Sequence, residues 1–228
     1  MSSSGFLIEL ESELDWRLTE VRSLENAITR ETDTVDREGL RKSLVVVLYA
    51  HFEGFCIFAL QHYRLAINAA QLKCEEVTHS ILAGAWSPVF IALQTGDQKC
   101  KFFKRSLPDD SYLHLHWRRR HFVEEVGRLN NLIVDVPEEV IDSESNLKPV
   151  VLKRNLFVLG LDETIVDPHA DVIQRLLKTR NDIAHGDRRK GVPIAEYEEY
   201  KDAVLKICST LVESLSEAYR SSSFRKPV

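Results

Sequence analysis

Glycine and proline are scarce in this chain, which holds 9 glycines and 7 prolines among 228 residues. Because both residues interrupt regular structure and supply tight turns, their scarcity argues against a turn-rich β protein and favours long helices. The hydrophobic share of 44% and the charged share of 29% are typical of a globular protein and exclude a disordered one. The length suits one domain that buries a full hydrophobic core.

The sequence also lacks cysteine pairs of the CxxC type and a basic region before its first apolar residues. The four cysteines lie in apolar or helical contexts, which predicts buried thiols in a reducing cytosol. We expect no signal peptide. The most apolar run, 44–60, is interrupted by His51 and Glu53 and is short for a bilayer, so we interpret it as a core helix. These features predict a cytoplasmic protein that makes no membrane contact.

Several catalytic signatures are missing too. The chain has no glycine-rich phosphate loop, no nucleophile elbow and no carboxylate cluster with the spacing of a metal site. The histidines His114, His116 and His121 lack a nearby cysteine or acidic partner. The arginines between them would repel a cation. We therefore expect neither a metal nor a cofactor.

Apolar residues recur at spacings of three, four and seven, which predicts amphipathic helices. The second helix is apolar all round in its middle, so we expect it at the centre of a bundle. Gly160 is predicted to cap the third helix in the left-handed conformation, and Asp167 and Pro168 to begin the fourth. The sequence therefore predicts an all-α bundle of four to five main helices. These helices are expected over 6–28, 36–72, 147–159, 168–186 and 193–219.

The segment 73–145 has weaker patterns, with short helical stretches around 77–95 and 117–132. We interpret it as a helical insertion into the bundle. The last residues, 221–228, are expected to form a frayed tail. The domain prediction is thus one domain over 1–228 that carries an insertion and a tail.

The chain as a whole has no excess of positive charge, because its net charge is -5. Two stretches nevertheless form basic islands: 99–121 has seven lysines and arginines against two aspartates, and 178–190 has five against two. Such an island can hold a phosphate backbone, although solvated surface charge is the alternative. Trp117 is expected either to stack on a base or to anchor the insertion. The residues expected to contact RNA are Arg118, Arg119, Arg120, Arg188, Arg189 and Lys190.

An Arg-x4-His motif, Arg180 to His185, closes the fourth predicted helix. A histidine exchanges protons near neutral pH, so His185 is suited to take the proton of a ribose 2′-hydroxyl or to return one to the leaving oxygen. Arg180 stays charged and offers a planar fork to a phosphate as negative charge builds up. The alternative is a purely structural helix end, because cations near a helix C-terminus interact favourably with its dipole.

The motif in its setting resembles the signature Arg-x4-6-His of the HEPN superfamily (higher eukaryotes and prokaryotes nucleotide-binding). The run 48–55 and the segment 146–161 resemble a prokaryotic branch linked to toxin–antitoxin and phage-defence loci. The resemblance implies a metal-independent endoribonuclease that acts as a homodimer, with Arg180 and His185 in the active site and Asn181 as their polar neighbour. One HEPN toxin group silenced by nucleotidylation has a tyrosine where this chain has Asp187, so that route of control is not expected.

Three further residues are candidates for supporting roles: Asp182 beside the arginine, and His51 and Glu53 in the apolar second helix. Charged groups in such a helix need partners, either in a buried structural hydrogen bond or in a role beside His185. Five residues at about 100° each place Arg180 and His185 roughly 140° apart around an ideal helix. A two-fold dimer in which both motif helices face one cleft is the simplest way to gather both groups.

The sequence thus predicts a metal-independent endoribonuclease that cleaves RNA by 2′-hydroxyl attack. We expect a toxin or phage-defence effector that is restrained by an antitoxin or a companion protein. The first alternative is a non-catalytic HEPN-like module that binds nucleotide, RNA or a partner protein. The second is a structural helical subunit.

Overall fold

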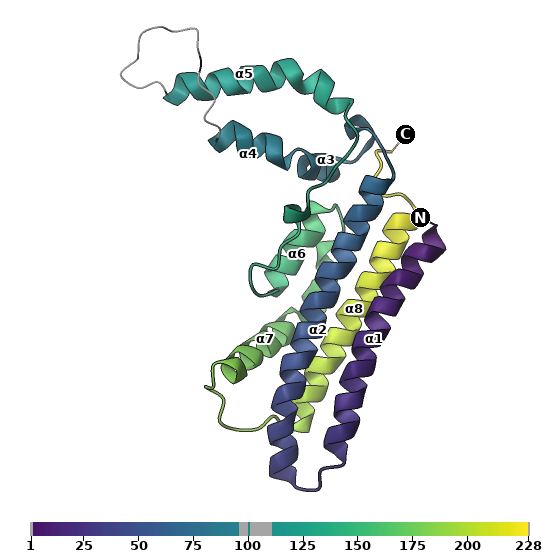
Figure 1. The fold of residues 1–228 in the computed structure, drawn as a ribbon, viewed down its shortest axis with the longest axis vertical. Helices are drawn as coiled ribbons and strands as arrows, with labels where there is room; N and C mark the ends of the chain where they lie inside the picture. Colours follow the sequence, from purple (N-terminus) through teal and green to yellow (C-terminus); the bar gives the residue numbers. More distant parts are fainter. Residues whose placement is uncertain (1, 96–99, 101–110, 228) are drawn as a thin grey trace.

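The computed structural model describes residues 2–95, 100 and 111–227, and its fold is drawn in Figure 1. Over these residues the regular structure is helical, apart from two isolated β-bridges. The predicted all-α class is therefore confirmed. The α-helices are α1 (Ser3–Thr29), α2 (Thr34–Ala69), α3 (His79–Ala85), α4 (Ser87–Thr95), α5 (Ser111–Asn130), α6 (Pro149–Val158), α7 (Ala170–Ala184) and α8 (Ile194–Arg220). Short 3₁₀ helices are η1 (Cys74–Glu76), η2 (Glu138–Val140) and η3 (Glu163–His169).

Three long helices, α1, α2 and α8, stand side by side and form the body of the molecule (Figure 1). By length and composition alone α2 could cross a membrane, and half of its most apolar window is buried here. It contacts α1, α6, α7 and α8, so helices surround it as its all-round apolar middle predicts. Phe55 and Leu60 on α2 and Leu215 on α8 are fully buried in the shared core. The bundle thus holds α7, which carries the motif, against the centre of the molecule.

The start of the motif helix differs from the prediction. A 3₁₀ helix, η3, precedes α7, and Asp162 caps it by accepting a hydrogen bond from the backbone N–H of Thr164 at 2.9 Å. The expected cap, Asp167, instead forms an ion pair with Lys153, with 2.6 Å between Nζ and Oδ1. Asp167 and Pro168 lie inside η3, and α7 begins only after its N-cap residue, His169. Gly160 follows α6 at a φ of +71°, which confirms the predicted left-handed cap.

The insertion forms an arm of two helices, α4 and α5, that projects from one end of the bundle (Figure 1). Residues 99 and 101–110 of the first basic island lie outside the described residues. Trp86 and Phe122 meet edge to face at a ring distance of 5.8 Å and form a small apolar cluster at the base of the arm. The arm starts and ends at the linkers 70–78 and 131–136, which a β-bridge between Lys73 and Ile133 holds together.

The prediction of a frayed tail is wrong for residues 221–227, which the structure describes. Phe224 is buried, with its ring 6.3 Å from the ring of Tyr63. The backbone N–H of Thr78 donates to the carbonyl of Phe224 at 2.9 Å. A large apolar side chain near the end of the chain gains free energy by leaving water, so the tail packs onto the bundle.

Candidate functional site

The motif lies at the last turn of α7, which packs on α2 and α8. Its apolar face buries Ile173, Leu176 and Leu177, and this fixes the orientation of the helix. Gly186 then adopts a φ of +79°, a conformation that favours glycine. The chain reverses there, and the N–H of Asp187 donates to the carbonyl of Asp182 at 2.8 Å. The helix therefore ends directly after the motif.

The Arg180 guanidinium is held on three sides. Its Nη1 donates to Oδ1 of Asn181 at 2.9 Å and to Oδ1 of Asn146 at 3.3 Å. Its Cζ lies 5.2 Å from the ring centroid of Tyr49, in a cation–π contact. Over the described part of the chain, Nε and Nη2 have no hydrogen-bond partner. The guanidinium is thus fixed through one nitrogen, and its other donors have no partner among the described residues.

Glu53 fixes the segment that supplies Asn146. Its Oε1 accepts a hydrogen bond from the backbone N–H of Leu147 at 3.1 Å. This bond joins the middle of α2 to the loop before α6, ninety-four residues further along the chain. Glu53 therefore has a partner, as a charge in an apolar helix requires, and it positions Asn146 beside Arg180.

The hydroxyl of Tyr49 stays protonated at neutral pH. Burial, together with the nearby charge of Glu53, raises the pKa of Tyr49 to about 12, although Arg180 and the backbone N–H of Leu147 oppose the shift. Tyr49 is therefore not suited to act as a base. Its ring provides a flat, buried surface under Arg180.

His185 occupies the C-cap position of α7 and is exposed. Its backbone N–H donates to the carbonyl of Asn181 at 2.9 Å. Its imidazole makes no hydrogen bond within the residues that the structure describes. The His185 side chain is thus exposed to solvent at the end of α7.

His51 lies on another side of α2 from Tyr49 and Glu53 and faces α1. Its Nδ1 lies 3.4 Å from Nη1 of Arg17, and its Nε2 lies 3.1 Å from Oε2 of Glu20. Burial lowers the pKa of His51, and the charge of Glu20 opposes this shift. These contacts favour the structural interpretation of His51, because they place it between α1 and α2 and away from the motif.

The basic residues after the motif divide into two kinds. Arg188 forms a bidentate ion pair with Glu196, with distances of 2.9 and 2.8 Å, and this pairing lowers the pKa of Glu196. Lys42 donates from Nζ to the carbonyl of Arg188 at 2.7 Å. Arg188 thus fastens the loop between α7 and α8. Arg189 and Lys190 are exposed beside the motif.

That loop is also held by a close backbone approach. The N–H of Val192 donates to the carbonyl of Glu38 at 2.9 Å, and a Cβ on Gly191 would lie 2.4 Å from the Cβ of Glu38. No side chain fits at position 191. Asp182 of the motif is half-buried, and its backbone carbonyl accepts from Asp187 and Arg188 at the start of the same loop.

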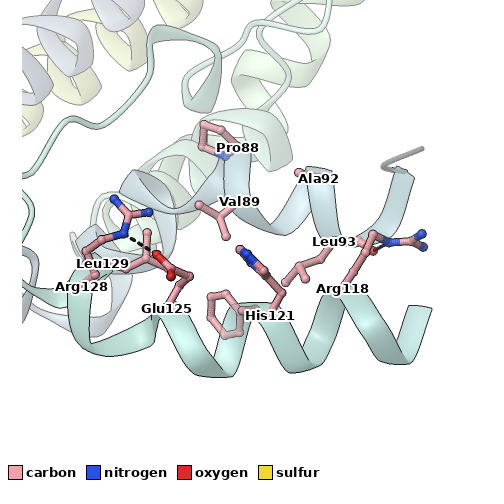
Figure 2. Close-up of a pocket in the computed structure, with 10 residues that line it drawn as sticks. Pro88, Val89, Ala92, Leu93, Arg118, His121, Glu125, Arg128 and Leu129 are labelled. Atoms are coloured by element: carbon pink, nitrogen blue, oxygen red, sulfur yellow. Dashed lines mark hydrogen bonds and ion pairs between the residues drawn. The ribbon is translucent and has the colours of Figure 1, made fainter. Parts of the chain in front are cut away.

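The three arginines of the arm, Arg118, Arg119 and Arg120, belong to α5, and this helix lies far from the C-terminus of α7 in Figure 1. Arg118 lines a groove of about 370 Å³ between α4 and α5, where its Nε donates to the carbonyl of Leu93 at 3.0 Å (Figure 2). Arg120 pairs with Glu124 at 2.8 Å, and Arg119 is exposed. His114 accepts a hydrogen bond on Nδ1 from the N–H of Cys100 at 3.0 Å. The structure therefore separates the predicted RNA contacts into two surfaces.

Sequence reasoning assigned no role to Asn146, although its segment contributed to the family resemblance. The only nearby signal in the sequence is Pro149, the first residue of α6, which follows Asn146 by three positions. Within residues 2–95, 100 and 111–227, no group of three or more His, Cys, Asp or Glu side chains has the arrangement of a metal site.

The comparisons with known proteins identify the family of the chain. The model of the HEPN_MAE_28990-like HEPN family matches residues 6–224, which include the bundle, the arm and the motif. Searches of curated proteins and of solved structures find no match. Because the family model covers nearly the whole chain, this protein belongs to the HEPN_MAE_28990-like HEPN family.

Proposed function

We propose that this protein is a metal-independent endoribonuclease of HEPN type. The observation that supports the proposal best is the state of Arg180. Asn146, Asn181 and Tyr49 hold its guanidinium, and its remaining donors are unpaired within the described residues. A fixed cation with free donors is what the charge of a transition-state phosphate needs, because such a group reorganises little during the reaction.

The proposed reaction is attack of a ribose 2′-hydroxyl on the adjacent phosphorus. His185 takes the hydroxyl proton, the bond from the 2′-oxygen to phosphorus forms and the bond to the 5′-oxygen breaks. A water molecule or the second His185 of a dimer supplies the proton that the 5′-oxygen gains. Arg180 neutralises the charge that builds on the phosphate oxygens. The products are a 2′,3′-cyclic phosphate and a 5′-hydroxyl.

A homodimer is part of the proposal. Arg180 is half-buried and held toward α2, whereas His185 is exposed at the helix end. A two-fold arrangement of α7 brings the His185 of one subunit to the Arg180 of the other. Asp182, Arg189 and Lys190 lie in or next to this helix end. We propose that Arg189 and Lys190 contact the RNA backbone there.

We further propose that the enzyme is a toxin or phage-defence effector that an antitoxin or companion protein restrains.

The alternative is a non-catalytic HEPN-like module that binds nucleotide, RNA or a partner. One observation favours that alternative: no hydrogen bond among the described residues fixes the imidazole of His185. Growth arrest on expression that disappears in His185→Ala supports the toxin, and unaffected growth supports the alternative.

Purified wild-type protein is expected to cleave single-stranded RNA in excess EDTA and to leave 2′,3′-cyclic phosphate ends. The nucleophile comes from the substrate, so replacing one ribose with 2′-deoxyribose should block cleavage at that position alone. Gel analysis of end-labelled RNA with a phosphatase-sensitivity assay measures both effects. Cleavage of an all-DNA strand, or loss of activity in EDTA, would contradict the proposed chemistry.

Glu53→Gln is expected to retain cleavage within about threefold of wild type, because glutamine keeps an oxygen that accepts from Leu147. Glu53→Ala removes the acceptor and loosens the segment that holds Asn146, so cleavage should fall roughly ten- to a hundredfold. It should also lower the free energy of unfolding by about 1–2 kcal/mol. Rates on one RNA substrate and denaturant unfolding test the pair of variants. If Gln is as inactive as Ala, Glu53 acts through its charge and not by positioning Asn146.

A further inference from the structure

The helix α5 has two different long faces. One face lines the groove toward α4, where Arg118, Phe122 and Leu129 lie (Figure 2). The other face, called here the outer face of α5, turns away from that groove. It consists of Tyr112, His116, Arg119, Arg120 and Val123, which the helical period of 3.6 residues places along one side.

The outer face presents an aromatic ring to solvent. The Tyr112 side chain is 73% exposed. Its ring stacks on that of His116, with centroids 6.3 Å apart and an interplanar angle of 23°. One side of the tyrosine ring is therefore supported by the protein, and solvent surrounds much of the rest.

The charge of this face is positive in a chain that is negative overall. The two acidic residues of α5 are both engaged: Glu124 pairs with Arg120, and Glu125 pairs with Arg128 (Figure 2). Arg119 is exposed and has no ion-pair partner within the described ranges. The outer face thus combines an uncompensated cation with a supported aromatic ring.

We propose that the outer face of α5 binds single-stranded RNA, with Tyr112 stacking on a base and Arg119 contacting a phosphate. Stacking on exposed rings in a cationic setting is how proteins hold single strands whose bases are unpaired. A duplex hides its base faces, so it does not fit this surface. The inference rests on the proposed function, because it specifies the form of the RNA substrate and a second place where it is held.

The groove on the other face of α5 is a weaker candidate for RNA. Its floor is apolar, and its two arginines are already bonded, Arg118 to the carbonyl of Leu93 and Arg128 to Glu125. The observations therefore favour the outer face.

The test is fluorescence anisotropy with a labelled 12-nucleotide oligoadenylate and a blunt RNA duplex of equal length. All variants carry His185→Ala, so that bound RNA stays intact. Tyr112→Ala is expected to weaken binding of the single strand roughly 5- to 100-fold, and Tyr112→Phe to stay near the parent. Arg119→Gln should reduce the slope of log affinity against log salt by about 0.7. Arg22→Gln, at an exposed arginine of α1, is the matched control and should change neither quantity.

Circular dichroism of each variant confirms that it is folded. The proposal is wrong if Tyr112→Ala binds the strand as Arg22→Gln does, or if duplex and single strand bind equally. It is also wrong if Tyr112→Ala leaves RNA affinity unchanged and instead dissociates a protein complex. The two proposals can fail separately. If RNA binding depends on Tyr112 but the protein cleaves no RNA, the nuclease proposal is wrong and the binding surface on α5 is supported. If cleavage needs Arg180 and His185, and Tyr112→Ala changes neither cleavage nor RNA affinity, the nuclease is supported and the binding surface on α5 is wrong.

Discussion

Arg180→Ala is expected to lower kcat/KM for RNA cleavage roughly 10²- to 10³-fold, the usual effect of losing a preorganised donor to a transition-state oxyanion. Arg180→Lys should lose nearly as much. In the structure Nη1 holds Asn146 and Asn181 while the other nitrogens stay available. An ammonium group has a single nitrogen, so it cannot keep both asparagines and also present a planar fork to phosphate.

Steady-state cleavage of a short labelled RNA measures this loss, and Lys178→Ala is the matched control on the same helix. Lys178 is exposed, so its removal leaves the network around Arg180 intact. Thermal unfolding separates a local effect from loss of fold. If Arg180→Ala retains cleavage above a tenth of the wild-type rate, the reacting phosphate does not meet this guanidinium and the proposed site is misplaced.

Mixing two inactive variants, Arg180→Ala and His185→Ala, is expected to restore cleavage to as much as about one quarter of the wild-type rate. Random reassortment makes about half of the dimers mixed, and each mixed dimer holds one intact pair of the two possible, formed by the His185 of one subunit and the Arg180 of the other. Each variant alone lacks one member of every pair.

The mixture is equilibrated under conditions that allow exchange of subunits, and cleavage is followed over time. Native mass spectrometry of one tagged variant shows whether mixed dimers form. A double variant with both substitutions in one chain, mixed with an equal amount of wild type, is the control. Half of the wild-type chains then lie in mixed dimers that hold no intact pair, so cleavage should fall to about half. Mixed dimers without restored cleavage would mean that each subunit works with its own Arg180 and His185, or that the motif does not cleave.

Local sequence signals predicted the helices and the family, because they depend on residues near each other in the chain. The spacing of apolar residues gave the long helices, and Gly160 marked a helix end that the structure confirms. The Arg-x4-His motif led to the family that the comparisons show. The predicted start of α7 at Pro168 was wrong, because the chain first forms the 3₁₀ helix η3 there and α7 begins only after His169.

The surroundings of the motif could be predicted only in part. Asn146 and Tyr49 reach Arg180 from segments that are far away in sequence, so no spacing rule brings them together. His51 and Glu53 are two positions apart, yet one faces α1 and the other faces the site. A helical period places them on different sides, but which side meets α7 depends on how the bundle packs. The docked tail was missed because Phe224 stands alone, without a periodic pattern.

The packing of Phe224 against the linker before α3 also bears on how the chain folds during synthesis. Thr78 emerges from the ribosome long before Phe224, whose carbonyl accepts its hydrogen bond. Because Phe224 follows α8 in the chain, this bond forms only after α8 has been made. Contacts between such distant positions form slowly, since a long loop has to close first. A nascent chain that stops short of α8 also lacks the helix against which α7 packs. The Arg-x4-His motif is thus translated before the scaffold that orients it is finished, so a chain that stops before α8 should lack the proposed cleavage activity.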